Sequence, residues 1–269
     1  MQYILEGSNI PSAPLRRDDS CKTDFGTVGA LTGCDEMTGA AILCGRAVLH
    51  CGAGLLVQSS QRKALDILRL AVPEAICVSP ERLFERRLDS CVIGCGIGRG
   101  YDELLPDLFC RLDIPTVIDA DGINFIAMHK DITKNMHCSL VITPHPGEMS
   151  RLTGLSVPEI QSDRINIAID LAAEINAVTV LKGHNTVIAM PNGDAFVDHL
   201  GGTELAKGGS GDVLAGIIAS LCAQGMSVRD AALLGVHTHS AAGKSLASEY
   251  GVRGVMPSDL CAEAGRLLC

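Results

Sequence analysis

The residues best suited to chemistry are Gly208-Gly209-Ser210-Gly211-Asp212, directly before a predicted helix that begins at Val213. Glycines before a helix let backbone N–H groups converge on an anion, and the positive end of the helix dipole lies at the same place. We call residues 208–211 the glycine cradle and expect it to bind phosphate. The dipole also favours an ionised Asp212, which could act as a base beside the phosphate. The alternative is that Asp212 only caps the helix.

A second motif, Lys182-Gly183-His184-Asn185-Thr186, follows a predicted strand over 178–181. A lysine and a threonine at a strand end, with a glycine that permits close approach of the backbone, suit the phosphates of a nucleotide. A simple turn with Lys182 exposed to solvent is the alternative. No Lys-Ser/Thr pair follows the glycine cradle, so the chain has no Walker loop there. Lys207, just before the cradle, is expected to face either the phosphates or solvent.

A third motif, Thr143-Pro144-His145-Pro146-Gly147-Glu148, follows a predicted strand over 140–142. Each proline fixes its own φ and pushes the preceding residue toward extended geometry, so His145 is held from both sides. An imidazole held in this way can be presented to a ligand. Pro146 and Glu148 are typical of the first turn of a helix. The alternative is therefore a helix start that carries a surface histidine.

Two carboxylates, Asp119 and Asp121, follow a predicted strand over 116–118. On extended backbone, residues two apart face the same side, where they could hold hydroxyl groups or help to hold Mg²⁺. The alternative is one helix cap and one turn residue. The glycine-rich run over 94–100 is not a dinucleotide fingerprint, because Arg99 occupies the place of the third glycine. We expect a tight turn there, suited to a flat ligand.

The segments that must position these motifs alternate between strand-like and helix-like patterns. This alternation predicts βαβ units and a mostly parallel central sheet with helices on both faces. Pro191-Asn192-Gly193 predicts a hairpin between strands over 186–190 and 194–197, and so an antiparallel edge. In open α/β sheets, ligands bind beyond the carboxyl ends of the strands, where all four motifs fall. Besides those named above, we predict strands over 28–32, 55–58, 75–78 and 91–93 and helices over 38–51 (capped by Thr38), 61–70, 101–112, 157–176 and most of 212–269.

Length and composition indicate one globular domain over residues 1–269, with residues 1–24 as a polar arm. The formal charge of −9 and the eight aromatic residues argue against a general nucleic-acid binder. The longest apolar run, over 213–223, is too short to cross a membrane, and the N-terminus lacks the order of a signal peptide. We therefore expect a cytoplasmic protein. Its 12 cysteines form no C-x-x-C pair and are expected to be small buried hydrophobes, with a zinc site or disulfide framework as the alternative.

In combination, these motifs resemble the ADP- or ATP-dependent NAD(P)H-hydrate dehydratases, a branch of the ribokinase-like superfamily. The resemblance covers about residues 20–265. TPHPGE, KGxxT and GGSGD in this order are specific, although any one alone is not. The matching stretches are 22–26, 37–43, 51–54, 94–98, 117–124, 142–154, 181–188, 206–225 and 235–243.

The resemblance implies a ribokinase-like three-layer α/β/α fold with a mostly parallel central sheet and an antiparallel edge. It implies an enzyme that restores NADH and NADPH from their hydrates, NADHX and NADPHX, acting on the S epimer. Nucleotide hydrolysis drives the loss of water with the help of Mg²⁺. Bacterial members of the family generally use ADP and release AMP and phosphate, whereas eukaryotic members use ATP. The motifs alone do not choose between the two nucleotides.

The resemblance also implies roles for individual residues. Asp212 is the expected base and a substrate contact, and no metal ligand is assigned. The anion hole is expected at the backbone of Gly209, Ser210 and Gly211. The expected contacts of NADPHX are Ala41, Gly96, His145 and Asp212. The expected contacts of the nucleotide are Lys182, Gly183, His184, Asn185, Thr186 and Gly211.

The chain departs from the family pattern at two places. Lys22-Thr23 stands where the family usually has Lys-Gly, and Gly94-Cys95-Gly96 stands where many members have Gly-Pro-Gly. The epimerase domain that is often fused in the family is not found in this sequence, so a separate NAD(P)HX epimerase is the expected functional partner. A homotetramer is expected because relatives are often tetrameric. A small-molecule kinase of the same superfamily, of thiazole or sugar type, and a non-catalytic nucleotide sensor are the alternatives.

Overall fold

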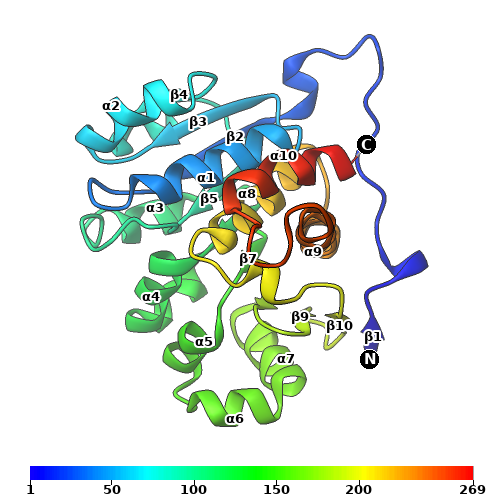
Figure 1. The fold of residues 1–269 in the computed structure, drawn as a ribbon. Coiled ribbons are helices and arrows are strands. Elements are labelled where there is room, and N and C mark those ends of the chain that lie inside the picture. Colours follow the sequence, from blue (N-terminus) through cyan, green and yellow to red (C-terminus); the bar gives the residue numbers. More distant parts are fainter. Residues whose placement is uncertain (269) are drawn as a thin grey trace.

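The central sheet contains ten strands in the order β1-β10-β9-β8-β7-β6-β5-β2-β3-β4. The structure is a computed structural model that describes residues 1–268 (Figure 1). All strand pairs are parallel except the two that involve β9. The strands are β1 (Gln2–Ile4), β2 (Thr27–Leu31), β3 (Leu55–Ser59), β4 (Ile76–Val78), β5 (Ser90–Ile93), β6 (Thr116–Ile118), β7 (Leu140–Ile142), β8 (Ala177–Leu181), β9 (Thr186–Ala189) and β10 (Ala195–Asp198).

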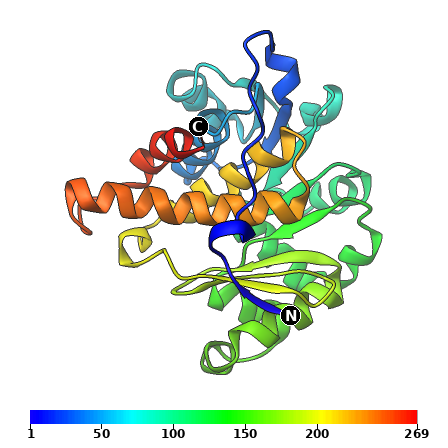
Figure 2. The same cartoon turned by 90° about the vertical axis from the view of Figure 1, so that its right-hand side faces the viewer.

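Helices cover both faces of this sheet, so the predicted three-layer α/β/α fold is confirmed (Figures 1 and 2). One layer packs α8 against α1 and α9, with α10 and α2 beside them. The other layer contains α3 to α7. The helices are α1 (Thr38–His50), α2 (Arg62–Ala71), α3 (Leu105–Arg111), α4 (Ala120–Met128), α5 (Pro146–Thr153), α6 (Val157–Ser162), α7 (Arg164–Ile175), α8 (Ser210–Ala223), α9 (Val228–Tyr250) and α10 (Pro257–Leu267).

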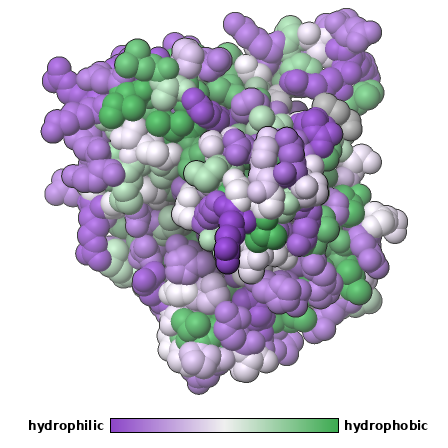
Figure 3. All heavy atoms as spheres, in the orientation of Figure 1, coloured by the Kyte–Doolittle hydropathy of each residue, from purple (hydrophilic) through white to green (hydrophobic). Residues whose placement is uncertain are grey.

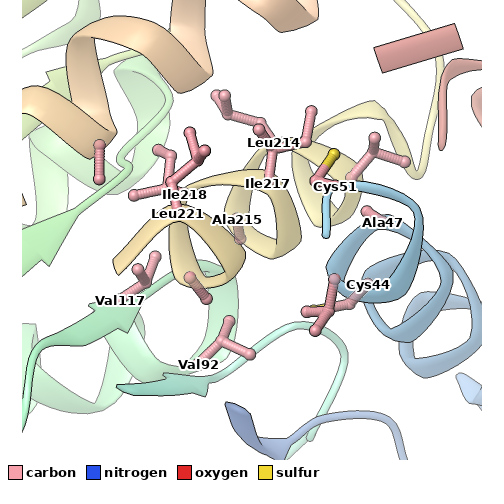
Figure 4. Close-up of a cluster of buried hydrophobic side chains, with 14 of the residues drawn as sticks. Cys44, Ala47, Cys51, Val92, Val117, Leu214, Ala215, Ile217, Ile218 and Leu221 are labelled. Atoms are coloured by element: carbon pink, nitrogen blue, oxygen red, sulfur yellow. The ribbon is translucent and has the colours of Figure 1, made fainter. Parts of the chain in front are cut away.

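The core consists of two apolar layers, one on each side of the sheet. Successive side chains of a strand point to opposite faces, so Val92 packs under α8 whereas Ile93 packs under the opposite helices. Val117 and Ile118 of β6 repeat the pattern. Figure 4 shows α8 above Val92 and Val117 of the sheet, with α1 beside it in the same layer. Burial on both faces explains why these parallel strands are continuous apolar runs in the sequence.

The predicted hairpin between β9 and β10 is confirmed, but it does not form the outermost part of the sheet. β10 also pairs with β1, in parallel, through residues 2–4 and 195–197. The Tyr3 ring stacks on that of Phe196, with centroids 4.9 Å apart. The arm predicted over residues 1–24 therefore begins with a strand that covers the edge of the sheet.

Besides α3, which covers only residues 105–111 of the helix expected over 101–112, three helices differ from the prediction. The long helix expected over 157–176 is divided into α6 and α7 at Asp163, whose backbone is not helical (φ −145°, ψ 54°). Thr38 is the first residue of α1 rather than its cap, and its hydroxyl donates to the carbonyl of Cys34. The last of the three, α8, begins at Ser210 and not at Val213. Its first turn therefore contains part of the glycine cradle.

The surface in Figure 3 is covered mainly by hydrophilic residues, with hydrophobic residues in small groups. Among residues 1–268, no helix is both long and apolar enough to cross a membrane. Seven of the eleven cysteines within this range are buried, as expected for small hydrophobes in a core. Cys269 lies outside the described residues.

Candidate active site

The glycine cradle forms the N-terminal end of α8. Gly209 caps the helix with a φ of +98°, and a Cβ at this position would lie 2.4 Å from Cδ1 of Leu43. A side chain at this position would be strained by the backbone conformation, and Leu43 would also have to move. Within residues 1–268, the N–H groups of Gly209, Gly211 and Asp212 have no hydrogen-bond acceptor. They lie at the positive end of the helix dipole, which makes the cradle an anion site.

Asp212 lies in the first turn of α8 and lines the same cavity as the cradle. We expected the helix dipole to favour its ionised form. The structure shows the opposite balance: burial raises the pKa of Asp212 to about 6, with a further contribution from the negative charge of Asp119. The charge of Lys182 and a hydrogen bond with Cys95 lower the pKa only in part. A carboxylate with a pKa near 6 is still ionised at neutral pH and is a stronger base than an ordinary aspartate.

Lys182 and Asp119 form an ion pair at the floor of the cavity. The Nζ of Lys182 lies 2.6 Å from Oδ1 of Asp119, and the hydroxyl of Thr143 donates to the same oxygen (2.7 Å). A Cβ on Gly211 would lie 3.2 Å from this Nζ, so the ammonium group lies directly beside the cradle. Burial alone would lower the pKa of Lys182, but the charges of Asp119 and Glu148 outweigh it and raise the pKa. The ammonium group is thus a fixed positive charge next to the anion site.

His145 caps α5, as the two prolines predicted. The ring Nδ1 of His145 accepts hydrogen bonds from the backbone N–H groups of Gly147 and Glu148. The backbone N–H of His145 donates to Oε2 of Glu148 (2.8 Å). Since Nδ1 accepts, Nε2 carries the proton in the neutral ring, and it lies 3.3 Å from Oε1 of Glu148. Burial lowers the pKa of His145, with a further effect of Lys182. A neutral imidazole therefore lies at the cavity wall.

The turn between β8 and β9 is held by Arg164, whose guanidinium donates to the carbonyls of Leu181 (2.8 Å) and Lys182 (3.3 Å). The hydroxyl of Thr186 donates to the carbonyl of Gly183. The φ of Asn185 is +56°, and its side chain pairs with His199 (2.8 Å). The turn therefore keeps its shape without a ligand.

A cavity of about 740 Å³ joins most of the predicted site residues. Ala41, Gly96 and Asn185 do not line it. The side chain of Ala41 is fully buried against Gly33, whereas the neighbouring Ala40 faces Gly96. The predicted residues that line the cavity are His145, Lys182, Gly183, His184, Thr186, Gly209, Ser210, Gly211 and Asp212.

Two of the sequence expectations about charged residues near the site are wrong. Asp119 and Asp121 do not face the same side, because Asp119 caps α4 and only Asp121 lies within the helix. Asp119 points to Lys182, whereas Asp121 accepts the N–H of Gly98 (2.9 Å). Lys207 was expected to face either phosphate or solvent, but its ammonium group donates to the carbonyls of residues 253 and 255.

Sequence reasoning missed His239 and the loop over 201–206. The Nε2 of His239 lies 3.0 Å from the hydroxyl of Ser210, and burial lowers the pKa of His239 to about 4. The loop closes one side of the cavity and is tied to α9 by the pairs Asp198–Ser240 and Glu204–Lys244. In the sequence, His239 stands two residues after His237. On a helix this spacing places the two side chains on different faces, so it does not indicate a shared site.

Comparison with known proteins shows which family the chain belongs to. A family model described as NAD(P)H-hydrate dehydratase matches residues 28–266. The ADP-dependent (S)-NAD(P)H-hydrate dehydratase of Neisseria meningitidis is 35% identical, over 94% of this chain and 88% of that protein. The bifunctional NAD(P)H-hydrate repair enzyme Nnr of Moorella thermoacetica is 38% identical, over 92% of this chain and 50% of that protein. The chain thus spans about half the length of the first curated relatives it matches.

Solved structures agree with this assignment. The ADP/ATP-dependent NAD(P)H-hydrate dehydratase of Bacillus subtilis, co-crystallized with ATP/Mg²⁺, superposes with a TM-score of 0.85 at 29% identity, over 97% of this chain and 98% of that one. The ribokinase-like fold expected from the sequence is confirmed by such neighbours. The motifs TPHPGE, KGxxT and GGSGD, which the fold brings to one cavity, occur here in a chain that belongs to the NAD(P)H-hydrate dehydratase family.

Proposed function

We propose that this chain is an ADP-dependent (S)-NAD(P)H-hydrate dehydratase, which converts NADHX and NADPHX to NADH and NADPH and releases AMP and phosphate. One observation carries the proposal: the carboxylate of Asp212 and the free N–H groups of the glycine cradle face the same cavity. Phosphoryl transfer to a hydroxyl group requires a base and a phosphate site in one cavity. The names of the relatives supply the identity of the substrate.

In the first step, Asp212 takes the proton of the ring hydroxyl while the hydroxyl oxygen attacks the terminal phosphorus of ADP. The bond from that phosphorus to the bridging oxygen breaks and releases AMP. The cradle N–H groups and the ammonium of Lys182 stabilise the charge on the transferring group. Phosphate then leaves with the electron pair of the C–O bond, and loss of a proton from the adjacent ring carbon restores the double bond.

Mg²⁺, which the family uses, fits one carboxylate of this cavity. Magnesium is usually held by one or two carboxylates together with substrate phosphates. The group Cys95, Asp119 and Asp212, whose ligand atoms lie within 4.8 Å of one another, includes a thiol and an aspartate already paired with Lys182, so it suits Mg²⁺ poorly. Glu148 also lines the cavity, and its oxygens are the better ligands because Lys182 lies farther from it (3.9 Å) than from Asp119. Bound there with the nucleotide phosphates, the ion would neutralise charge on the transferring group.

The two substrates would bind to segments that follow different strands of the sheet. The turn over 182–186 follows β8 and would hold ADP, and His145 follows the neighbouring β7 and would contact the hydrated ring. We expect Ala40 and Gly96 to border the substrate beyond His145, on the side of β5. A separate epimerase, which would supply the S epimer, is the proposed functional partner, and a homotetramer is the proposed assembly.

The test is recovery of NADH. The protein is incubated with NADHX, Mg²⁺ and either ADP or ATP, and the near-ultraviolet absorbance of NADH is followed. We expect recovery with ADP and a loss of turnover of at least about 100-fold in Asp212→Asn, with ADP binding by calorimetry little changed. No recovery with either nucleotide would reject the dehydratase. If NADHX stays intact but an added thiazole alcohol or sugar becomes phosphorylated, the protein is a small-molecule kinase instead.

A further inference from the structure

A second cavity, of about 510 Å³, lies beside the first at the same edge of the sheet. Its walls come from the turn after β5, from α4 and from α5. Gly98 donates its N–H to Asp121 (2.9 Å), and the amide of Asn124 donates to the other oxygen of Asp121 (3.3 Å). These bonds fix the turn to α4. The cavity therefore has a defined shape without a ligand.

Two arginines border this cavity. Arg99 comes from the turn after β5 and Arg151 from α5, and both are exposed at its rim. The guanidinium of Arg151 donates to Oδ1 of Asn124 (3.0 Å), and that of Arg99 contacts only the sulfur of Met128 (3.8 Å). Within the described part of the chain neither arginine has a carboxylate partner. Their charges are thus free to bind an anion.

The rest of the lining is mixed. Phe125, Ala127 and Met128 provide an apolar surface, and Met128 is exposed although it is apolar. Asp102 offers carboxylate oxygens that can accept hydrogen bonds from hydroxyl or amino groups. Free guanidinium groups, a hydrogen-bond acceptor and an apolar wall together suit a phosphorylated nucleoside better than an inorganic anion. A guanidinium and a thioether can lie against the two faces of a base.

The position of the second cavity indicates which phosphorylated nucleoside it would bind. Along the sheet, the turn that would hold ADP follows β8, on one side of His145, whereas the second cavity is lined by segments that follow β7, β6 and β5. His145 caps α5 and lines the first cavity, and Arg151 of the same helix lines the second, so α5 borders both cavities. A hydrated dinucleotide reacts at one end only. Its other half must extend from the reacting ring away from ADP, toward Gly96 and Gly98.

We propose that this second cavity binds the adenosine half of the hydrated dinucleotide, with Arg99 and Arg151 contacting its phosphate groups. The proposal rests on the proposed function, because it assigns a subsite for the same substrate. It makes the two arginines binding residues and not catalytic ones, since both line the second cavity and not the cavity that contains Asp212. Their loss should therefore affect binding of the dinucleotide and leave the chemical step unchanged.

The variants Arg99→Gln and Arg151→Gln remove each charge but keep a polar side chain. With saturating ADP, we expect the KM for NADPHX to rise roughly threefold to tenfold in each, with kcat and the KM for ADP unchanged. Hydrated nicotinamide mononucleotide, which lacks the adenosine half, should be converted equally well by the variants and the wild type. Lys130→Gln, an exposed cation at the end of α4 that does not line the cavity, is the matched control.

A binding measurement separates this proposal from the proposed function. NADPH is titrated calorimetrically into protein saturated with a non-hydrolysable ATP analogue, so that only the dinucleotide site is free. Weaker binding in both arginine variants, but not in Lys130→Gln, supports the subsite whether or not turnover is observed. Unchanged NADPH affinity in both arginine variants overturns the subsite even if the wild type restores NADH. Loss of activity on the truncated mononucleotide would also overturn it, since the arginines would then act at the reacting ring.

Discussion

The ammonium group of Lys182 lies 2.6 Å from Oδ1 of Asp119, and this pair connects two motifs that are 63 residues apart in the sequence. Asp119 is almost completely buried, and its negative charge is tolerated because Lys182 and Thr143 both donate to it. Glu148 contributes a second negative charge, 3.9 Å from the same ammonium group. Lys182 thus balances two buried carboxylates and gives the anion site its positive charge.

Lys182→Met should therefore destabilise the fold as well as the site. Removing one partner leaves Asp119 as an uncompensated buried charge, and we expect the free energy of unfolding in urea to fall by about 3–5 kcal/mol. The matched control is Lys134→Met, which removes an equally short but exposed pair with Asp131 and should leave the stability nearly unchanged. Equal losses in both variants would show that burial of the Asp119 pair has no energetic consequence. The double variant with Asp119→Asn should lose less than the sum of the two single variants.

Activity should fall on acidification below pH 6. The base must be ionised to take a proton, and burial raises the pKa of Asp212 to about 6. We expect kcat/KM to be constant above this pH and to fall about tenfold for each pH unit below it. Because the hydrogen bond from Cys95 lowers the pKa of Asp212, Cys95→Ala should move the acid limb to higher pH. An acid limb near pH 4 in the wild type would contradict the assignment of Asp212 as the base.

The glycine cradle offers a matched pair of substitutions. Gly209→Ala places a Cβ 2.4 Å from Leu43 at a φ of +98°, so we expect the free energy of unfolding to fall by about 1–3 kcal/mol. It should also displace the N–H groups and reduce turnover. Gly208→Ala meets no atom within 4 Å and should change stability by less than about 1 kcal/mol. Urea unfolding of both variants tests the difference, and equal stability would contradict the strained geometry at Gly209.

The strands and the motifs could be predicted because their signals are local. Parallel strands buried on both faces are short apolar runs, and the hairpin is marked by Asn192-Gly193. The start of α5 at Pro146 was predicted for the same reason. β1 was missed because residues 2–4 are an edge strand, whose partner β10 lies nearly 200 residues away. Propensity contains no information about such a pairing.

The side chains around the motifs were predictable only in part. The spacing of Asp119 and Asp121 led to a wrong geometry because helix α4 begins between them, so they project in different directions. Asp212 was expected to be stabilised as an anion by the helix dipole, but its burial, which depends on the loop over 201–206 and on neighbouring strands, outweighs that effect. The first difference comes from the position of a helix boundary, and the second from tertiary contacts, which short-range patterns do not specify.

His239 should make the stability of the protein depend on pH. Burial lowers the pKa of His239 to about 4, whereas an unfolded chain has a histidine pKa near 6.5. Between these values the unfolded state binds a proton that the folded state does not, so stability falls as the pH is lowered from 6.5 toward 4. The test compares the free energy of urea unfolding at pH 7.5 and at pH 4.5. The fall in this free energy between the two pH values should be about 1–3 kcal/mol smaller in His239→Gln than in the wild type.

The raised pKa of Asp212 acts in the opposite direction over much of the same range, because there the folded state binds the extra proton. Only the difference between the wild type and His239→Gln therefore isolates the histidine. The exposed His50, replaced by Gln, serves as the control and should leave the pH dependence as it is. If His239→Gln and the wild type show the same slope, burial does not lower the pKa of His239 in the folded state, and this prediction is wrong.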